Sequence, residues 1–186
     1  MSLYTSIPPE EAILNAKEIM ERQDFKHYGF AILDMTSLLH IILRNTYFSF
    51  EERIFLQVGG LPMGSSISGI LAILFMDTLE RRALLSQHGI GLYARYVDDI
   101  FALVENREAA EELLRTMDQQ HQNIKFELEH ADENNALRLL DFCITIGEDA
   151  SPQFDFYKKK AKRDIFVHAK SALPWNAKMS IIRNEK

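Results

Sequence analysis

Two adjacent aspartates, Asp98 and Asp99, are the residues of this sequence whose types and spacing most directly suggest chemistry. They separate two short apolar runs, Tyr93–Val97 and Ile100–Val104, which are rich in the β-branched and aromatic residues typical of strands. Because Asp tolerates tight turns, the pattern predicts a β-hairpin with both carboxylates at its tip. Such a tip has two interpretations: it is an ordinary acidic turn, or it holds divalent metal ions for phosphoryl transfer.

The metal interpretation has a specific chemical basis. Phosphoryl transfer requires stabilisation of the attacking and leaving oxygens, and two divalent ions about 3.5–4 Å apart provide both. Magnesium prefers hard oxygen ligands, usually one or two carboxylates together with substrate phosphates. Adjacent carboxylates also repel each other unless a cation neutralises them, so a pair at one tip suits a cation site.

A second candidate feature is the segment Gly59–Ser66, which contains three glycines, one proline and two serines in eight residues. It leads directly into an apolar-rich stretch that we expect to be a helix. A glycine-rich loop before a helix exposes backbone N–H groups to an anion or a base edge. Glycine and proline also precede many helices for purely structural reasons, so both interpretations stay open.

The elements that must position these residues follow from the spacing of apolar side chains. Helices are expected over residues 8–23, 36–45, 66–86 and 107–122, and strands over 47–50, 53–58, 93–97, 100–104, 124–129, 137–146 and 154–157. This mixed order, with mostly antiparallel strands, predicts a single α+β domain.

Composition narrows the class of protein. The chain has 186 residues, of which 47% are hydrophobic and 26% charged, as in an ordinary folded globular domain. The longest apolar-rich segment, residues 67–85, is interrupted by four charged side chains, which favours a buried helix over a membrane span. The N-terminus lacks the features of a signal peptide, and the single Cys143 excludes an internal disulfide and fits a reducing compartment. We therefore expect an intracellular protein, nuclear or cytoplasmic, that is neither secreted nor bound to a membrane.

Charge is distributed unevenly along the chain. The net charge is −6, yet residues 157–186 carry nine Lys or Arg against two acids, a net +7 that leaves −13 for the rest. An acidic body with a basic end can be a metal-binding body beside a phosphate-binding arm. It can equally be a solvated face with a basic tail.

Taken in order, several of these stretches resemble the palm of a reverse transcriptase, most closely that of Penelope-like retroelements. The matching segments are Ser2–Pro8 for the end of the first catalytic motif, Gly60–Ser68 for the second, Tyr96–Asp99 for the third, Asn123–Phe126 for the fourth, Leu139–Phe142 for the primer-gripping fifth, and Tyr157–Lys160 with Ser171–Pro174 for the passage into the thumb. Several motifs in the right order are far more specific than any one of them.

The resemblance implies a right-hand polymerase palm over residues 1–157, an antiparallel sheet with helices packed on one face. The basic start of a thumb would follow over residues 158–186. The implied activity is that of an RNA-directed DNA polymerase, with two Mg²⁺ or Mn²⁺ ions as cofactors. Its partners would be an RNA template, a DNA primer and deoxynucleoside triphosphates.

The resemblance also implies roles for individual residues. Asp98 would be the direct metal ligand and Asp99 the supporting one, while Lys125 would protonate the leaving pyrophosphate. Tyr4 would pack against the sugar and exclude a 2′-hydroxyl. An exposed strand lysine and a core tyrosine would look the same in sequence, so these alternatives stay open for Lys125 and Tyr4.

A further set of residues is expected, by the same resemblance, to contact template or primer. Glycines would allow close backbone approach, Tyr96 would lie near the primer end, and the lysines would bind phosphates unless they form a merely solvated tail. The set comprises Gly60, Pro62, Met63, Gly64, Ser65, Tyr96, Leu140, Phe142, Lys158, Lys159 and Lys160.

The sequence departs from the family in its first motif, where an aspartate three residues before the position of Ser2 would precede Met1. The fingers and a C-terminal endonuclease are also absent, so we expect a truncated fragment that is inactive as a polymerase. One rival is a decayed or domesticated remnant that binds nucleic acid or protein without catalysis. Another is an unrelated α+β domain, favoured by a structure that lacks a three- or four-stranded sheet exposing the aspartates.

Overall fold

A computed structural model describes residues 2–24, 29–85, 88–147, 151–157, 171, 174–176 and 178–179. The chain divides into two compact units, Met1–His130 and Ala131–Lys186. The elements, in order, are α1 (Leu3–Ser6), α2 (Pro9–Arg22), α3 (Ile32–Arg44), β1 (Tyr47–Phe50), β2 (Arg53–Leu56), α4 (Ser66–Leu84), β3 (Ile90–Tyr96), β4 (Asp99–Val104), α5 (Arg107–Gln119), β5 (Ala136–Leu139), β6 (Phe142–Ile146) and β7 (Pro152–Phe156). The structure is therefore a mixture of helices and antiparallel strands, as the sequence predicts.

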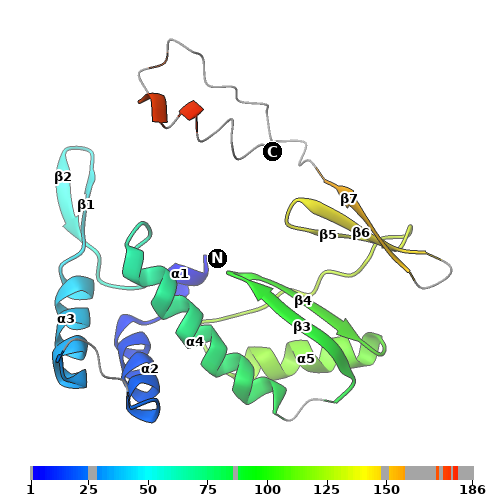
Figure 1. The fold of residues 1–186 in the computed structure, drawn as a ribbon, viewed down its shortest axis with the longest axis horizontal. Coiled ribbons are helices and arrows are strands. Elements are labelled where there is room, and N and C mark those ends of the chain that lie inside the picture. The colour runs from blue at the N-terminus through cyan, green and yellow to red at the C-terminus, as the bar shows by residue number, and fades with distance from the viewer. Residues whose placement is uncertain are drawn as a thin grey trace. The chain divides into compact units, whose positions relative to one another are not determined.

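Helix α4 is the centre of the first unit (Figure 1). It packs against α1, α2 and α5, and α3 packs against the other side of α2. Apolar side chains from α2, α3 and α4 and from three connecting segments form the main core: Ile7, Ala12, Ile13, Ala16, Leu39, Leu43, Leu61, Leu71, Ala72, Phe75, Met76, Leu79 and Ile124. Burial of this apolar surface is the main force that holds the helices together.

One face of the hairpin β3–β4 lies on α4 and α5 (Figure 1). Tyr93, Ile100 and Ala102 pack from this face against a small cluster formed by Ala83, Leu113 and Met117. The predicted hairpin, with helices on one side, is confirmed for this sheet. The sheet has two strands in the part of the chain that the structure describes, fewer than the three or four expected for a palm.

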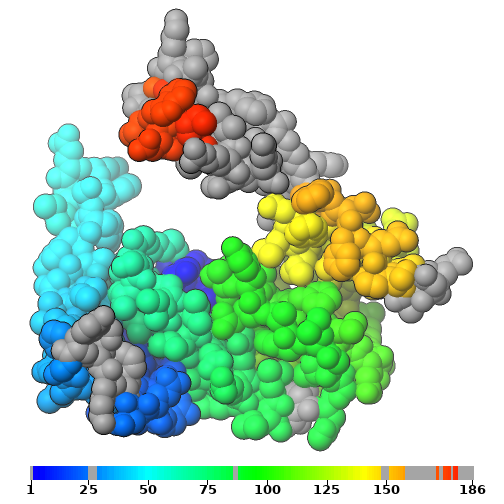
Figure 2. All heavy atoms as spheres, in the orientation of Figure 1, coloured from blue at the N-terminus to red at the C-terminus, as the bar shows by residue number. Residues whose placement is uncertain are grey.

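The hairpin β1–β2 is also two-stranded and antiparallel. Its two-residue turn contains Glu51 and Glu52 with φ of 47° and 62°, the left-handed geometry that fits the twist of a tight hairpin. All of its strand residues are exposed, and in Figure 2 it stands out as the cyan projection beyond the helices. Phe48 and Phe55 stack across the strands with ring centroids 5.5 Å apart.

The second unit contains an antiparallel three-stranded sheet in the order β5-β6-β7. The sequence predicted a single strand over residues 137–146, and this prediction is wrong. Leu140 adopts φ of 55° and, with Asp141, turns the chain so that Leu139 pairs with Phe142. The palm-to-thumb boundary expected after residue 157 concerns a segment that is mostly outside the described residues, so it stays a prediction.

Two further differences from the predicted elements have local causes. The helix expected to begin near residue 36 begins at Ile32. There the Asp34 carboxylate accepts the N–H of Ala31 at 3.0 Å and satisfies one of the backbone donors at the start of α3. Residues 124–129 alternate as expected but form no strand, since the Phe126 N–H donates to the Asp118 carboxylate at 2.9 Å instead of to a neighbouring strand. None of the described helices, α4 included, is long and apolar enough to span a membrane.

Candidate functional site

Asp98 and Asp99 occupy the tip of the β3–β4 hairpin, as the sequence predicted. Tyr96 pairs with Asp99, so that Val97 and Asp98 form a two-residue turn. Both carboxylates are exposed, and neither makes a hydrogen bond or an ion pair with any described residue. Two adjacent anionic side chains with free oxygens are therefore presented to solvent.

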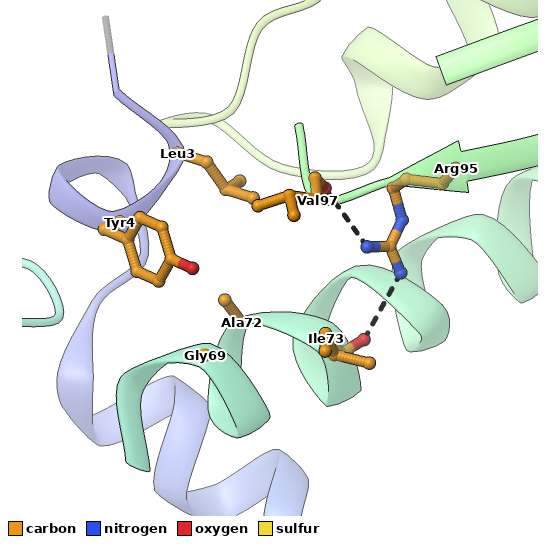
Figure 3. A pocket seen from close by; sticks show the side chains of 7 residues that line it. All are labelled: Leu3, Tyr4, Gly69, Ala72, Ile73, Arg95 and Val97. Carbon is orange, nitrogen blue, oxygen red and sulfur yellow. Dashed lines mark hydrogen bonds between the residues drawn. The ribbon is translucent and has the colours of Figure 1, made fainter. Parts of the chain in front are cut away.

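The turn before Asp98 has an unusual backbone. Val97 has φ of 57°, and among the described non-glycine residues with positive φ it alone is β-branched. Left-handed geometry is strained for such a side chain and persists only where the surroundings hold it. Here the Arg95 guanidinium donates from Nη1 to the Val97 carbonyl at 3.1 Å (Figure 3).

Arg95 is itself fixed by a buried network on α4. Its Nε donates to Glu80 Oε1 at 2.5 Å, and the hydroxyl of Tyr93 donates to the same oxygen at 2.9 Å. The side chains of Arg95 and Glu80 are only 11% and 10% exposed. Burial of the Tyr93 hydroxyl and, to a smaller extent, the nearby Glu80 carboxylate raise the pKa of Tyr93 well above its ordinary value. The hydroxyl therefore remains a donor.

Tyr4 lies in the same neighbourhood as the turn. A small cavity, lined mostly by apolar groups, is formed by Leu3, Tyr4, Gly69, Ala72, Ile73, Arg95 and Val97. In Figure 3 the Tyr4 hydroxyl points towards α4, and Leu3 faces Val97 across the cavity. The structure thus brings the predicted sugar-contacting tyrosine close to the strained residue that precedes the aspartates.

The glycine-rich loop has an inner and an outer half. Gly60 and Pro62 are buried, and a Cβ on Gly60 would lie 2.7 Å from the Cα of Thr5. The N–H of Leu61 also donates to the Tyr4 carbonyl at 2.7 Å. Glycine is needed at position 60 because the loop packs closely on α1 there, a structural requirement that was not predicted from the sequence.

The outer half of the loop is open. Met63 and Gly64 are exposed, and a Cβ on Gly64, whose φ is 88°, would meet nothing within 4 Å. Ser65 is half-buried at the N-terminal boundary of α4, and its side chain caps no backbone group. These residues are accessible to a ligand in front of the α4 N-terminus, and their predicted template contact stays a prediction.

The remaining predicted site residues occupy other places. Lys125 is exposed and donates from Nζ to the Asp118 carbonyl at 2.9 Å, at the end of α5. In the second unit, Leu140 and Phe142 lie at the β5–β6 turn, and the Phe142 ring contacts Phe156 with centroids 5.2 Å apart. The three predicted primer-binding lysines, Lys158, Lys159 and Lys160, lie outside the described residues.

The side chains at the tip determine which metal ion it can hold. Within the described residues, no group of three or more His, Cys, Asp or Glu side chains is placed to hold a metal ion. Two adjacent free carboxylates do match the needs of Mg²⁺, which commonly takes one or two carboxylates and completes its shell with phosphates and water. Asp98 and Asp99 therefore fit as part of a magnesium site whose other ligands come from elsewhere.

Sequence reasoning missed the network of Glu80, Tyr93 and Arg95. A signal was present: Glu80 interrupts an apolar helix, and Arg95 interrupts an apolar strand directly before the aspartates. Charged residues at positions that face a core are rarely buried unless they are paired. Two opposite charges at inward positions therefore predict a buried ion pair.

Comparison with known proteins gives a consistent result. The family model described as "Reverse transcriptase (RNA-dependent DNA polymerase)" matches residues 5–131, more than half of the chain. Telomerase reverse transcriptase of Rattus norvegicus is 31% identical over 85 residues, which cover 44% of this chain and 8% of that protein. The chain thus spans only a small part of this curated relative. No solved structure matches significantly.

Proposed function

Since this chain belongs to the reverse transcriptase family, we propose that it is the palm of an RNA-directed DNA polymerase that adds deoxynucleotides to a primer at the Asp98–Asp99 tip. The motif order favours the Penelope-like branch for its origin. The observation that carries the proposal is the pair of unpartnered carboxylates on a hairpin whose backbone is held in a strained turn. An ordinary acidic turn needs no such support.

In this proposal Asp98 and Asp99 are the metal ligands that the chain itself contributes. When bound, Mg²⁺ or Mn²⁺ would neutralise the charge that develops on the phosphate oxygens during attack of the primer 3′ oxygen. The carboxylates hold the site at the hairpin tip, where both are exposed and can meet a triphosphate and a primer terminus.

Tyr4 and the glycine-rich loop would select the nucleotide and position the template. Tyr4 shares a cavity with Val97, so its ring is suitably placed to pack against the sugar of a nucleotide at the tip. A ring in this position would exclude a 2′-hydroxyl and favour deoxynucleotides. Met63, Gly64 and Ser65 would meet the template and the new base pair, supported by the rigid packing of Gly60 and Pro62 behind them.

Lys125 would serve as the proton donor to the leaving pyrophosphate. Its ammonium group is exposed and, among the described residues, is bound only to a carbonyl, a contact that it can exchange for a phosphate without leaving an ion pair behind. Leu140 and Phe142 would support the primer, together with the Lys158–Lys160 run.

In the reverse transcriptase family a further aspartate of the first motif bridges the metal ions, and the corresponding position here lies before Met1. Leu3 and Val97 line one cavity, so the described chain begins beside the turn. We infer that the 186-residue chain alone binds metal weakly and does not extend a primer, and that an aspartate two positions before Met1 completes the site.

The test is a titration with Mn²⁺ followed by electron paramagnetic resonance. It uses the 186-residue chain and a chain extended so that an aspartate stands two positions before Met1. We expect about tenfold tighter binding by the extended chain, and loss of binding in both chains with Asp98→Asn. Asp77→Asn, an exposed carboxylate on α4, is the matched control and should change nothing.

The same proteins are then assayed for primer extension on RNA and DNA templates. Extension by the 186-residue chain that Asp98→Asn abolishes would overturn the need for a third carboxylate. Mn²⁺ binding that is indifferent to Asp98→Asn and Asp99→Asn would overturn the metal site itself. Binding of an RNA–DNA hybrid without any metal binding at the tip would identify the chain as a non-catalytic remnant.

A further inference from the structure

We propose that Arg95 is a positioning residue that holds the Val97 carbonyl and thereby fixes the orientation of the two aspartates for metal. The inference rests on the proposed function, because it assigns Arg95 to the same metal site. It goes beyond that function in naming a residue that touches neither metal nor substrate, and in explaining why a buried ion pair lies behind the tip.

The guanidinium of Arg95 connects three parts of the molecule. Nε binds Glu80, Nη1 donates to the Val97 carbonyl at 3.1 Å, and Nη2 donates to the Ile73 carbonyl at 3.5 Å (Figure 3). Only arginine has donors in a rigid planar fork that can address three acceptors at once. The turn is therefore tied to the backbone and to a side chain of α4, the central helix of the unit.

Glu80 makes this attachment rigid. Its Oε1 accepts from both Arg95 and Tyr93, so the carboxylate cannot rotate without the loss of two hydrogen bonds. A buried ion pair adds little net stability compared with apolar residues of the same volume. Its value here lies in the fixed geometry that it imposes on the hairpin end.

The turn needs such a hold because of its own sequence. Val97 has φ of 57°, which is costly for a β-branched residue. Released from Arg95, the Val97 peptide would relax to an extended or right-handed geometry and would carry Asp98 with it. The orientation of the Asp98 carboxylate relative to that of Asp99 would then change.

The decisive variant is the double substitution Arg95→Met with Glu80→Leu. It removes both charges at similar volume, so the fold is expected to survive while the Val97 carbonyl loses its donor. Arg95→Lys is the second variant, since it keeps the charge beside Glu80 but cannot address three acceptors. The matched control is Arg81→Met with Asp77→Leu, which removes an exposed ion pair from the same helix.

Two measurements are made on each protein. Mn²⁺ affinity is obtained by electron paramagnetic resonance, and the Val97 geometry from the strong intraresidue amide–Hα nuclear Overhauser effect of a left-handed residue. We expect the double variant to bind Mn²⁺ at least about tenfold more weakly and to lose the left-handed signal, as typical losses on removal of supporting residues suggest. Arg95→Lys should show a smaller loss, and the control none.

The outcomes separate this inference from the proposed function. A folded double variant with wild-type Mn²⁺ affinity and an unchanged Val97 signal overturns the role of Arg95. Should the double variant fail to fold, wild-type affinity in Arg95→Lys overturns it in the same way. If Mn²⁺ binding to the wild type is indifferent to Asp98→Asn, the proposed metal site fails, and the Val97 signal alone decides whether Arg95 holds the turn.

Discussion

The two hairpins of the first unit have the same local design and different surroundings. Both β1–β2 and β3–β4 are antiparallel pairs with a two-residue turn in which at least one residue is left-handed. The β1–β2 hairpin exposes every strand residue, whereas β3–β4 lies on α4 and α5 and is tied to α4 by the Arg95–Glu80 pair. Local sequence makes a hairpin in both cases, but only tertiary contacts make one of them a rigid platform.

The two turns differ in how their backbone geometry is held. The turn of β1–β2 consists of two glutamates, and no predicted site residue lies on this hairpin. The turn of β3–β4 uses a β-branched residue and relies on a buried arginine to hold it. A site that must place two carboxylates within a fraction of an ångström needs this second kind of support.

The largest expected effect comes from breaking the anchor of β3–β4. Glu80→Ala leaves the Arg95 charge buried without its partner and should lower the free energy of unfolding by about 3–5 kcal/mol. Urea denaturation followed by circular dichroism measures the change. Asp77→Ala, which breaks an exposed pair on the same helix, should leave stability close to that of the wild type; equal losses would mean that the buried pair is not special.

A smaller loss of stability should follow when a β-branched residue, like Val97 of β3–β4, is placed in the β1–β2 turn. Glu52 has φ of 62°, so Glu52→Val places a β-branched residue in left-handed geometry with no arginine to hold it. We expect a cost of about 1 kcal/mol, seen as about fivefold faster amide exchange in the hairpin. Glu52→Asn, which tolerates this geometry, is the control and should exchange no faster than the wild type.

The stability that the Glu80–Tyr93–Arg95 network contributes should fall at alkaline pH. The folded-state pKa of Tyr93 lies above its unfolded value of 10.0, so the stability that its hydroxyl contributes is present below pH 10 and declines as the pH rises beyond it. The decline is below about 1.4 kcal/mol per pH unit, because Tyr93 is only half-buried and solvent screens its neighbours. Tyr93→Phe should remove this part of the decline in unfolding experiments from pH 9 to 11. An identical slope in both proteins would contradict the assigned cause.

The smallest effect concerns packing on the uncovered hairpin. Phe48→Ala removes one ring of the Phe48–Phe55 stack and should cost below about 1 kcal/mol, since the pair remains exposed and neither ring enters the core. Global unfolding should barely change, while amide exchange in β1–β2 accelerates. A loss comparable to that of Glu80→Ala would show that the hairpin is as strongly integrated as β3–β4.

The sequence predicted most of the elements and the position of the aspartates. Alternation and turn chemistry are local, so both hairpins and the helix α4 were recognised, and the resemblance that rested on ordered motifs agrees with the family match over residues 5–131. The expected strand at 124–129 did not form, because the Asp118 side chain, eight residues earlier and on the preceding helix, accepts the Phe126 N–H that a neighbouring strand would need. Local alternation cannot reveal such a competitor.

The supporting part of the site was not predicted, for a related reason. Arg95 and Glu80 are fifteen residues apart and on different elements, so their pairing depends on how β3 lies on α4. Gly60 was expected to approach a nucleic acid, which stays a prediction, and the structure adds that its Cα packs closely against Thr5. In both cases the residue type signalled a close contact, and only the fold identified the partner.

The packing of Gly60 on Thr5 also limits how the site can move. With the Leu61 amide bound to the Tyr4 carbonyl and no space for displacement beside Gly60, the inner loop and α1 would move as one rigid body. Gly64 is left-handed, and a Cβ there would meet open space, so the outer half of the loop lacks this restraint. Any movement of the loop is therefore expected at Met63 and Gly64, while the surroundings of Tyr4 keep their shape.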